Sequence, residues 1–271
     1  CLIDAAIHRF ELGRCRHKLC TQLLILRAQD FHHRGNFLDL RRQIVEVVEH
    51  ASMVAPRSAR SARLVWMIVL IANPKGGVGK STVATNLAGY YASVGQRTML
   101  GDLDRQQSAV SWLAIRPEFA PRIESWDRSD KHTARPPAGV THVVLDSPAG
   151  LRGGDLKDVL KLADRVIVPL QPSIFDIFAT QTFLAKLAER GTLSDAGKVG
   201  VLGMRVDERT RAAEQLHRFV EGLGLPVVGY LRDTQNYVYL AAQGLTLWDV
   251  APSRVAKDRE QWQPLLAWLE E

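Results

Sequence analysis

Residues 73–82 read NPKGGVGKST and directly follow the apolar run Met67–Ala72. A short continuous apolar run is typical of a β-strand that is buried on both faces. Glycines let the backbone after this strand adopt positive φ angles and come close to a ligand, because no Cβ stands in the way. The stretch therefore predicts a phosphate-binding loop between a buried strand and the N-terminus of a helix.

Each part of the predicted loop suits one part of a nucleoside triphosphate. Backbone N–H groups and the positive end of the helix are expected to bind phosphate oxygens. The Lys80 ammonium would neutralise the β- and γ-phosphates, and the Ser81 hydroxyl would bind Mg²⁺. The standard nucleotide loop needs glycine where this chain has Pro74, so the sequence fits the variant Lys-Gly-Gly-x-Gly-Lys-Ser/Thr instead. The alternative interpretation is a glycine-rich turn without a ligand.

Aspartates follow two other predicted strands. Asp146 ends the run Val143–Leu145, the pattern of a Walker B strand whose carboxylate holds the hydration shell of Mg²⁺. Asp102 and Asp104 alternate at the end of another strand, so their side chains are expected to face one way. One of them can orient a water for attack on the γ-phosphate while the other supports the metal. The alternative is that strand-end aspartates cap the next helix, and the residues alone leave both interpretations open.

Strand, loop and helix alternate from Met67 onward, which predicts an α/β fold. We expect a doubly wound, mostly parallel sheet flanked by helices, with right-handed crossovers. Ligands bind such sheets at the carboxyl ends of the strands, where the aspartates lie. The expected strands are Met67–Ala72, Thr98–Gly101, Ile123–Trp126, Val140–Leu145, Val166–Leu170, Val199–Met204 and Pro226–Tyr230. The expected helices are Ser81–Ser93, Ser108–Ile115, Phe175–Arg190, Glu208–Leu223 and the tail Trp262–Glu271.

Basic residues are concentrated at the start of the chain. Residues 1–66 hold 11 lysines and arginines against 6 acidic residues, a net charge of +5 out of +6 for all 271 residues. The chain begins with Cys, and Met67 opens the first predicted strand. We therefore expect residues 1–66 to be an N-terminal extension outside the native core, such as translated upstream sequence, and residues 67–271 to form the nucleotide-binding domain. A regulatory or DNA-binding arm is the alternative; Asn36–Ala51 has a helical pattern, but one helix does not make a helix-turn-helix.

Composition excludes several classes of protein. The three cysteines all lie within the first 20 residues and include no Cys-x-x-Cys pair, so they predict neither a disulfide framework nor a metal site. The apolar run Leu64–Ala72 is too short to span a bilayer. No secretory signal pattern opens the chain, so we expect the protein in the cytoplasm.

Five motifs together give a specific resemblance. They read NPKGGVGKST, DLDRQQSA, VVLDSPAG, VPLQPSIFD and AAQGLTLWDV. From Met67 to about Pro252 the chain resembles the ParA/MinD family of deviant Walker ATPases, and Pro74 favours the ParA branch. The resemblance implies an ATPase that forms a homodimer with ATP sandwiched at the interface. Its ATP hydrolysis would be slow and would be stimulated by a partner.

The resemblance also implies a role for each site residue. Lys75 would be the signature lysine, which reaches the partner subunit's phosphates, and Asp104 would orient the hydrolytic water, so these two form the expected catalytic pair. Mg²⁺ would be held by Ser81, Asp102 and Asp146. The expected ATP-binding residues are Lys75, Gly76, Gly77, Val78, Gly79, Lys80, Ser81 and Thr82. Three further residues match a family segment that lies near the nucleotide and the dimer interface: Gln171, Pro172 and Asp176.

The chain departs from the family pattern at two strand ends. Arg105 and Gln107 stand where the family often has Pro and Gly, which puts the geometry of the hydrolytic water in doubt. Met204 and Arg205 stand at a strand end where the family often has an Asn that recognises the adenine base. Adenine recognition is therefore open.

The implied biology is the positioning of cargo on DNA. ParA-like dimers bind DNA nonspecifically, in the bacterial cytoplasm and on the nucleoid, and segregate plasmids, chromosomes or protein cargo with a ParB-like or adaptor partner. Nonspecific DNA binding is mainly phosphate neutralisation, and the candidate basic residues are Arg205, Arg232, Arg254, Lys257 and Arg259.

Two rival functions remain open. A MinD-like membrane-associated ATPase would need a basic amphipathic C-terminal helix. The tail of this chain contains Pro264 and ends in two glutamates, so we expect no membrane contact. A P-loop metabolic enzyme is the other rival, and substrate-dependent turnover by a monomer would identify it.

Overall fold

The computed structural model describes residues 66–271, apart from residues 105, 127–135, 152, 190–197, 208 and 223. All the described residues belong to one compact unit. The predictions for residues 1–65, including the helix at Asn36–Ala51 and the three cysteines, lie outside the described part of the chain. None of the helices within that part is both long and apolar enough to cross a membrane.

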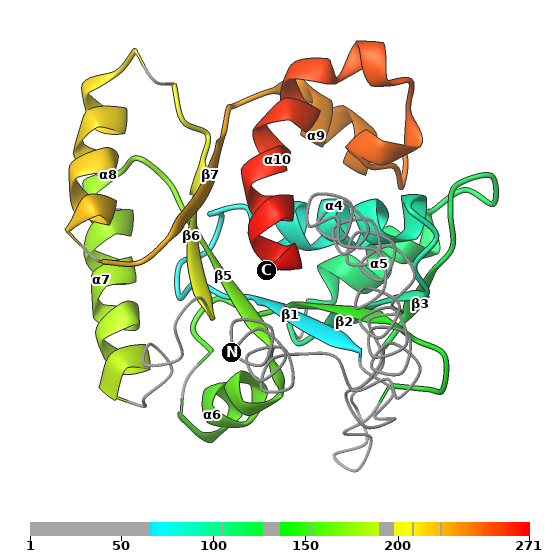
Figure 1. Ribbon diagram of the computed structural model, residues 1–271, viewed down its shortest axis with the longest axis horizontal. Helices are drawn as coiled ribbons and strands as arrows, with labels where there is room; N and C mark the ends of the chain where they lie inside the picture. The colour runs from blue at the N-terminus through cyan, green and yellow to red at the C-terminus, as the bar shows by residue number, and fades with distance from the viewer. Residues whose placement is uncertain are drawn as a thin grey trace, which may run out of the picture. The chain divides into compact units, whose positions relative to one another are not determined.

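A seven-stranded sheet forms the centre of the fold (Figure 1), and its strands lie in the order β3-β2-β4-β1-β5-β6-β7. All of its strand pairings are parallel. The strands are β1 Met67–Ile71, β2 Thr98–Asp102, β3 Ile123–Ser125, β4 His142–Asp146, β5 Arg165–Leu170, β6 Val199–Met204 and β7 Val227–Leu231. The predicted doubly wound parallel sheet is therefore confirmed.

Helices cover both faces of the sheet. One face is covered by α4 Lys80–Ser93, α5 Ser108–Ala114, α9 Gln235–Ala241 and α10 Ala256–Glu270. The other face is covered by α6 Gly153–Leu162, α7 Ile174–Glu189 and α8 Arg211–Glu221. Successive residues of β1 alternate between the two cores: Val69 and Ile71 pack on the α4 side, and Ile68 and Leu70 pack on the α6 side. This explains why the strand is apolar throughout rather than at alternate positions.

Two helices have no counterpart among the predicted elements. Helix α6 begins with Gly153 and Gly154, which are poor helix formers, and it is held by burial of its apolar residues Leu156, Val159 and Leu160. Helix α9 has only seven residues, too few for a clear periodicity. The C-terminal helix is also longer than predicted, because α10 starts at Ala256 and continues through Pro264.

The order of the strands determines where the predicted site residues lie. The chain leaves β1 through α4 toward β2, and it later passes from β4 through α6 to β5 on the other side of β1. The carboxyl end of β1 is therefore a topological switch point, where parallel sheets bind ligands. Asp146 lies in register with Ile71 on one side and with Asp102 on the other.

Candidate nucleotide-binding site

The loop after β1 has the backbone that its glycines predict. Gly77 and Gly79 have positive φ angles of 76° and 95°. Gly79 is the N-cap residue of α4, and no side chain caps this helix end. The first N–H groups of a helix need partners, and an anion at the end of the helix dipole can supply them.

Lys80 is a buried cation at the start of α4. Its Nζ donates a hydrogen bond of 2.6 Å to the backbone carbonyl of Lys75. Burial lowers the pKa of the Lys80 ammonium, while the charges of Asp146 and Asp104 oppose this shift. A buried ammonium is stabilised by a nearby anion, so Lys80 is suited to bind phosphate.

Asp146 supplies a buried carboxylate beside the loop. Its Oδ1 has no hydrogen-bond partner within the described residues. Burial raises the pKa of Asp146 to about 7, while a hydrogen bond from the Ser81 side chain favours the ionised form. An unpartnered buried carboxylate oxygen next to a hydroxyl fits a hydrated Mg²⁺.

The described residues include no group of three or more His, Cys, Asp or Glu side chains that could hold a metal ion by themselves. Mg²⁺ in nucleotide sites keeps several waters and uses one or two carboxylates together with substrate phosphates. Ser81 and Asp146 therefore fit Mg²⁺ held jointly with a nucleotide.

Asp102 is already hydrogen-bonded to the backbone. Its Oδ2 accepts from the N–H of Ala109 at 2.7 Å, and its Oδ1 accepts from the N–H of Asp104 at 2.9 Å. Asp102 thus caps α5, which is the alternative that the sequence left open. The Asp104 Oδ1 accepts from the Gln106 N–H at 3.1 Å, and the charge of the Asp104 carboxylate acts on both Lys80 and Asp146. The structure therefore gathers five predicted site residues at the carboxyl ends of the central strands: Lys80, Ser81, Asp102, Asp104 and Asp146.

Lys75 lies at the outer side of the loop. Its Nζ is 3.5 Å from Oδ1 of Asp176, near the start of α7, and the two side chains are 42% and 12% exposed. Asn73 holds the turn that carries Lys75, because its Oδ1 accepts from the Lys75 N–H at 2.9 Å. The buried Asn73 amide also donates to the carbonyl of Pro169 at 2.7 Å and to Thr180 Oγ1 at 2.9 Å.

The sequence prediction missed the roles of Asn73 and Thr180. Asn73 stands directly before the glycine-rich loop, and this position is its only signal in the sequence. Thr180 lies 107 residues away and carries no signal of its own. A second contact between the loop and the segment after β5 runs from Gln171 Nε2 to the Gly77 carbonyl, at 2.9 Å.

Two non-glycine residues near the site have left-handed backbones. Gln107, the N-cap residue of α5, has a φ of 51°, and Arg205 after β6 has a φ of 53°. Glycine would suit this conformation at position 107 better than glutamine does, because a Cβ disfavours it. Met204 is buried behind the loop, and a Cβ added to Gly79 would lie 2.7 Å from its Cε.

The AAQGLTLWDV motif forms a structural clamp. Asp249 makes a bidentate ion pair with Arg116, at 2.9 Å for both hydrogen bonds. Thr246 and Asp249 form a capping box at the start of a 3₁₀ turn. Asn86 on α4 accepts from the Leu247 N–H at 3.1 Å. The motif therefore fastens α4 and the α5–β3 segment to the C-terminal part of the fold.

Of the basic residues that are candidates for DNA binding, some are paired with other groups of the protein and some are exposed to solvent. Arg232 pairs with the buried Asp258 at 2.6 Å. Arg259 donates to the Leu247 carbonyl at 2.9 and 3.0 Å. Arg254 and Lys257 are exposed, and Arg205 lies 3.9 Å from Asp233.

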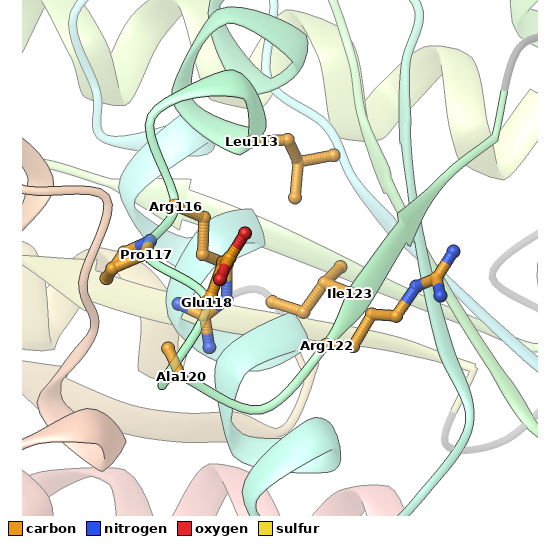
Figure 2. A pocket seen from close by; sticks show the side chains of 7 residues that line it. All are labelled: Leu113, Arg116, Pro117, Glu118, Ala120, Arg122 and Ile123. Atoms are coloured by element: carbon orange, nitrogen blue, oxygen red, sulfur yellow. The ribbon is translucent and has the colours of Figure 1, made fainter.

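A cavity of about 290 Å³ lies away from the loop, between α5 and β3 (Figure 2). Its lining residues are Leu113, Arg116, Pro117, Glu118, Ala120, Arg122 and Ile123. The Arg122 side chain extends away from the others in Figure 2, and Arg116 already binds Asp249. The cavity carries no predicted site residue.

A glycine-rich loop with a buried lysine, at the switch point of a parallel sheet, defines a P-loop nucleotide-binding protein. Residues 69–247 match the family described as the CobQ/CobB/MinD/ParA nucleotide binding domain, and the chain belongs to this family. The predicted membership of the ParA/MinD family is thereby confirmed.

Individual relatives agree with this assignment. The chain is 31% identical over 185 residues to the maintenance of carboxysome distribution protein A of Gloeobacter kilaueensis, covering 66% of this chain and 83% of that protein. It is 31% identical over 182 residues to the chromosome-partitioning ATPase Soj of Thermus thermophilus, covering 55% and 73%. The structure of a putative plasmid partition protein from Borrelia burgdorferi bound to AMPPNP has the same fold, with a TM-score of 0.58 at 17% identity over 74% of this chain and 99% of that one.

Proposed function

We propose that this chain is a ParA-type switch that dimerises on ATP and is reset by hydrolysis. The observation that carries the proposal is the pair of lysines in one loop. Lys80 is buried at the start of α4, suited to the phosphates of its own subunit, while the Lys75 side chain is 42% exposed to solvent. A cation supplied by a second subunit can stabilise charge on a transferring phosphoryl group.

The residues of the site divide the chemistry among them. The Lys80 ammonium and the backbone N–H groups from Gly76 to Thr82 would bind the phosphates, and Ser81 and Asp146 would hold Mg²⁺. When bound, Mg²⁺ neutralises charge on the phosphate oxygens. Asp104 would orient the water that attacks the γ-phosphorus, so that the bond to the oxygen bridging the β- and γ-phosphates breaks and ADP and inorganic phosphate are released. Asp102 supports this segment through its cap on α5.

A homodimer would cover the start of α7. Ile174, Phe175 and Phe178 expose 46%, 73% and 58% of their surface. Asp176, on the same helix turn, contacts Lys75. Exposed apolar groups gathered on one face indicate an interaction surface. We therefore assign this face of α7 to the second subunit in the ATP-bound dimer.

The cargo is proposed from the named relatives. They include a carboxysome distribution protein and chromosome-partitioning proteins, each about 30% identical or less. We propose that this chain positions a plasmid, a chromosome or a protein cargo, binds DNA nonspecifically on the nucleoid of a bacterial cytoplasm, and is stimulated by a ParB-like or adaptor partner. Exposed Arg254 and Lys257 are the basic side chains best suited to DNA phosphates.

The membrane-associated alternative has less support. The apolar residues of α10 are buried in the fold, and Trp262 and Leu265 are fully buried. A helix that packs in this way does not present an apolar face to lipid. The metabolic alternative has no specific observation in its favour.

The test is ATP-dependent dimerisation measured by light scattering, with nucleotide binding measured separately. Lys80→Ala is expected to abolish ATP binding. Lys75→Ala should retain binding but lose dimerisation and hydrolysis. Lys161→Ala, an exposed lysine on α6, is the matched control and should behave as the wild type. A Lys75→Ala protein that still dimerises with ATP would refute the proposal.

A further inference from the structure

The Asn73 side chain replaces a missing backbone bond where the chain leaves β1. At the end of this strand the Ala72 N–H donates to the Ile167 carbonyl of β5, at 3.0 Å. In a parallel ladder the next donor stands two residues further along, and there Pro74 has no N–H. The Asn73 amide donates to the Pro169 carbonyl instead, at 2.7 Å. A side chain thus continues the sheet while the backbone turns away.

This bond determines which way the Asn73 amide faces. A carbonyl oxygen can only accept, so the NH₂ group faces Pro169 and the amide oxygen faces the Lys75 N–H, which donates to it at 2.9 Å. An Asn side chain that bonds to the backbone two residues further on forms an Asx turn. The turn sets the course of the backbone at Lys75, whose carbonyl accepts from the Lys80 ammonium.

Thr180 on α7 supplies a second acceptor for the same NH₂ group. Its Oγ1 accepts from Asn73 Nδ2 at 2.9 Å, although the two residues are 107 positions apart. Thr180 is 0% and Asn73 is 2% exposed, so solvent does not compete for this bond. A buried N–H that loses its acceptor costs free energy. The Thr180 hydroxyl therefore stabilises the orientation of the Asn73 amide, and through it the turn that carries Lys75.

We propose that Thr180 is a positioning residue for Lys75: its hydroxyl orders the Asn73 turn, and this order favours the ATP-bound dimer. The inference rests on the proposed function of Lys75 and goes beyond it, since it assigns the preparation of that lysine to a buried hydroxyl on α7. A loop that is already ordered loses less conformational entropy on binding than a mobile loop does. Thr180 thereby lowers the cost of placing Lys75 on the phosphates of a second subunit.

Helix α7 connects this turn to the surface that we assign to the second subunit. Its exposed face carries Phe175 and Phe178, whereas Thr180 lies on its buried side. A helix moves as a rigid element and can carry coupling between the contacts on its two sides. Contact at the exposed face and order in the Lys75 turn are therefore linked through one helix.

The magnitude follows from the loss of one buried hydrogen bond. Such a loss corresponds to roughly a 2- to 10-fold shift in an equilibrium. Asn73 keeps its bond to Pro169 when the Thr180 hydroxyl is removed. The turn is therefore expected to stay in place but to open more often.

The first test measures hydrogen exchange of the Lys75 N–H in the nucleotide-free protein by nuclear magnetic resonance, under conditions where exchange reports the opening equilibrium. Thr180→Val has nearly the shape of threonine without the hydroxyl, and it should speed Lys75 exchange roughly 2- to 10-fold. Thr180→Ser retains the hydroxyl and should stay closer to the wild-type rate. Thr180→Ala is a second variant without the hydroxyl, and thermal unfolding identifies any variant that loses its fold.

The same helix offers a matched control. Thr182 is exposed, and its hydroxyl donates to the Phe178 carbonyl within α7 at 3.1 Å. Thr182→Val makes the same chemical change without touching Asn73 and should leave Lys75 exchange unchanged. The Val83 N–H, which donates to the Gly79 carbonyl at 2.9 Å, is the internal reference. Wild-type Lys75 exchange in the folded variants without the hydroxyl, or equally faster exchange at Val83, would overturn the proposal.

The second test measures dimerisation with ATP over a range of protein concentrations. Thr180→Val should need roughly 2- to 10-fold more protein than the wild type, while its affinity for ATP as a monomer stays close to the wild-type value. Thr180→Ser should recover dimerisation. Folded Thr180→Val that dimerises as readily as the wild type would overturn the link to dimerisation. If the wild type itself does not dimerise, the proposed function fails together with that link, whereas faster Lys75 exchange still supports the positioning of the turn by Thr180.

Discussion

Replacing Asp249 by alanine breaks a buried ion pair that joins two distant parts of the fold. The Arg116 and Asp249 side chains are 5% and 0% exposed. The Asp249 carboxylate accepts two hydrogen bonds from Arg116 and two from Thr246, all between 2.7 and 2.9 Å. Alanine removes all four and leaves the guanidinium buried without its counter-charge.

The expected loss of stability can be derived from these contacts. Removing one partner of a buried ion pair costs about 3–5 kcal/mol, since the remaining charge is desolvated and uncompensated. Arg116 keeps its hydrogen bonds to the carbonyls of Pro121 and Gly244, at 2.9 and 3.0 Å, which favours the lower half of that range. Loss of the capping box adds about 1 kcal/mol. We expect about 4 kcal/mol in total, or a fall of roughly 8–16 °C in the unfolding midpoint of a domain of this size.

The assay is thermal and urea unfolding followed by circular dichroism. Glu124→Ala, which removes a surface ion pair with Arg97 whose side chains are 48% and 26% exposed, is the control and should leave the midpoint nearly unchanged. The double variant Arg116→Met/Asp249→Leu should recover part of the loss, because it leaves no unpaired buried charge. A loss below about 1 kcal/mol for Asp249→Ala would refute the reasoning.

Three further predictions concern the site and its surroundings. Asp104→Ala should trap the ATP-bound dimer and lower hydrolysis by at least about 100-fold, the usual contribution of general acid–base catalysis; phosphate release at the wild-type rate would contradict the assigned role. Gln107→Gly should raise stability by roughly 0.5–1 kcal/mol, because a left-handed backbone disfavours a Cβ, and a measured decrease in urea unfolding would count against it. His142 stacks on Tyr91 at 4.0 Å, and burial lowers its pKa to about 4. The unfolded chain therefore binds the proton first, so stability should fall by roughly 1–3 kcal/mol as the pH drops from above 6.5 toward 4. An equal fall in His142→Gln would exclude this cause.

The parts of the site that are contiguous in the sequence could be predicted from it. The loop joins its strand and helix within 27 residues, so glycine spacing and apolar runs identify it. Asp146 could be predicted because it ends an unbroken apolar strand. The seven strands were also predicted, with boundaries that differ from the observed ones by at most two residues, since strand ends depend on pairing as well as on propensity.

The contacts of the aspartates could not be predicted. Asp102 ends a strand, and the sequence alone allowed it to bind metal or to cap a helix; its hydrogen bonds to Asp104 and Ala109 are visible only in the folded chain. The AAQGLTLWDV motif contributed to the resemblance to the family, but its sequence did not indicate which contacts it makes in the fold. Its Asp249 binds a residue 133 positions away.

The sequence by itself determined that a phosphate loop follows a doubly buried strand in an α/β chain. This information is local, because backbone freedom and apolar periodicity act over a few residues. Only the tertiary structure decided which side chains meet. The parallel order β4-β1-β5 brings Asp146 to one side of the loop and the β5–α7 segment, with Asp176, to the other. Lys75 therefore meets its acidic partner through strand pairing between segments that are far apart in the chain.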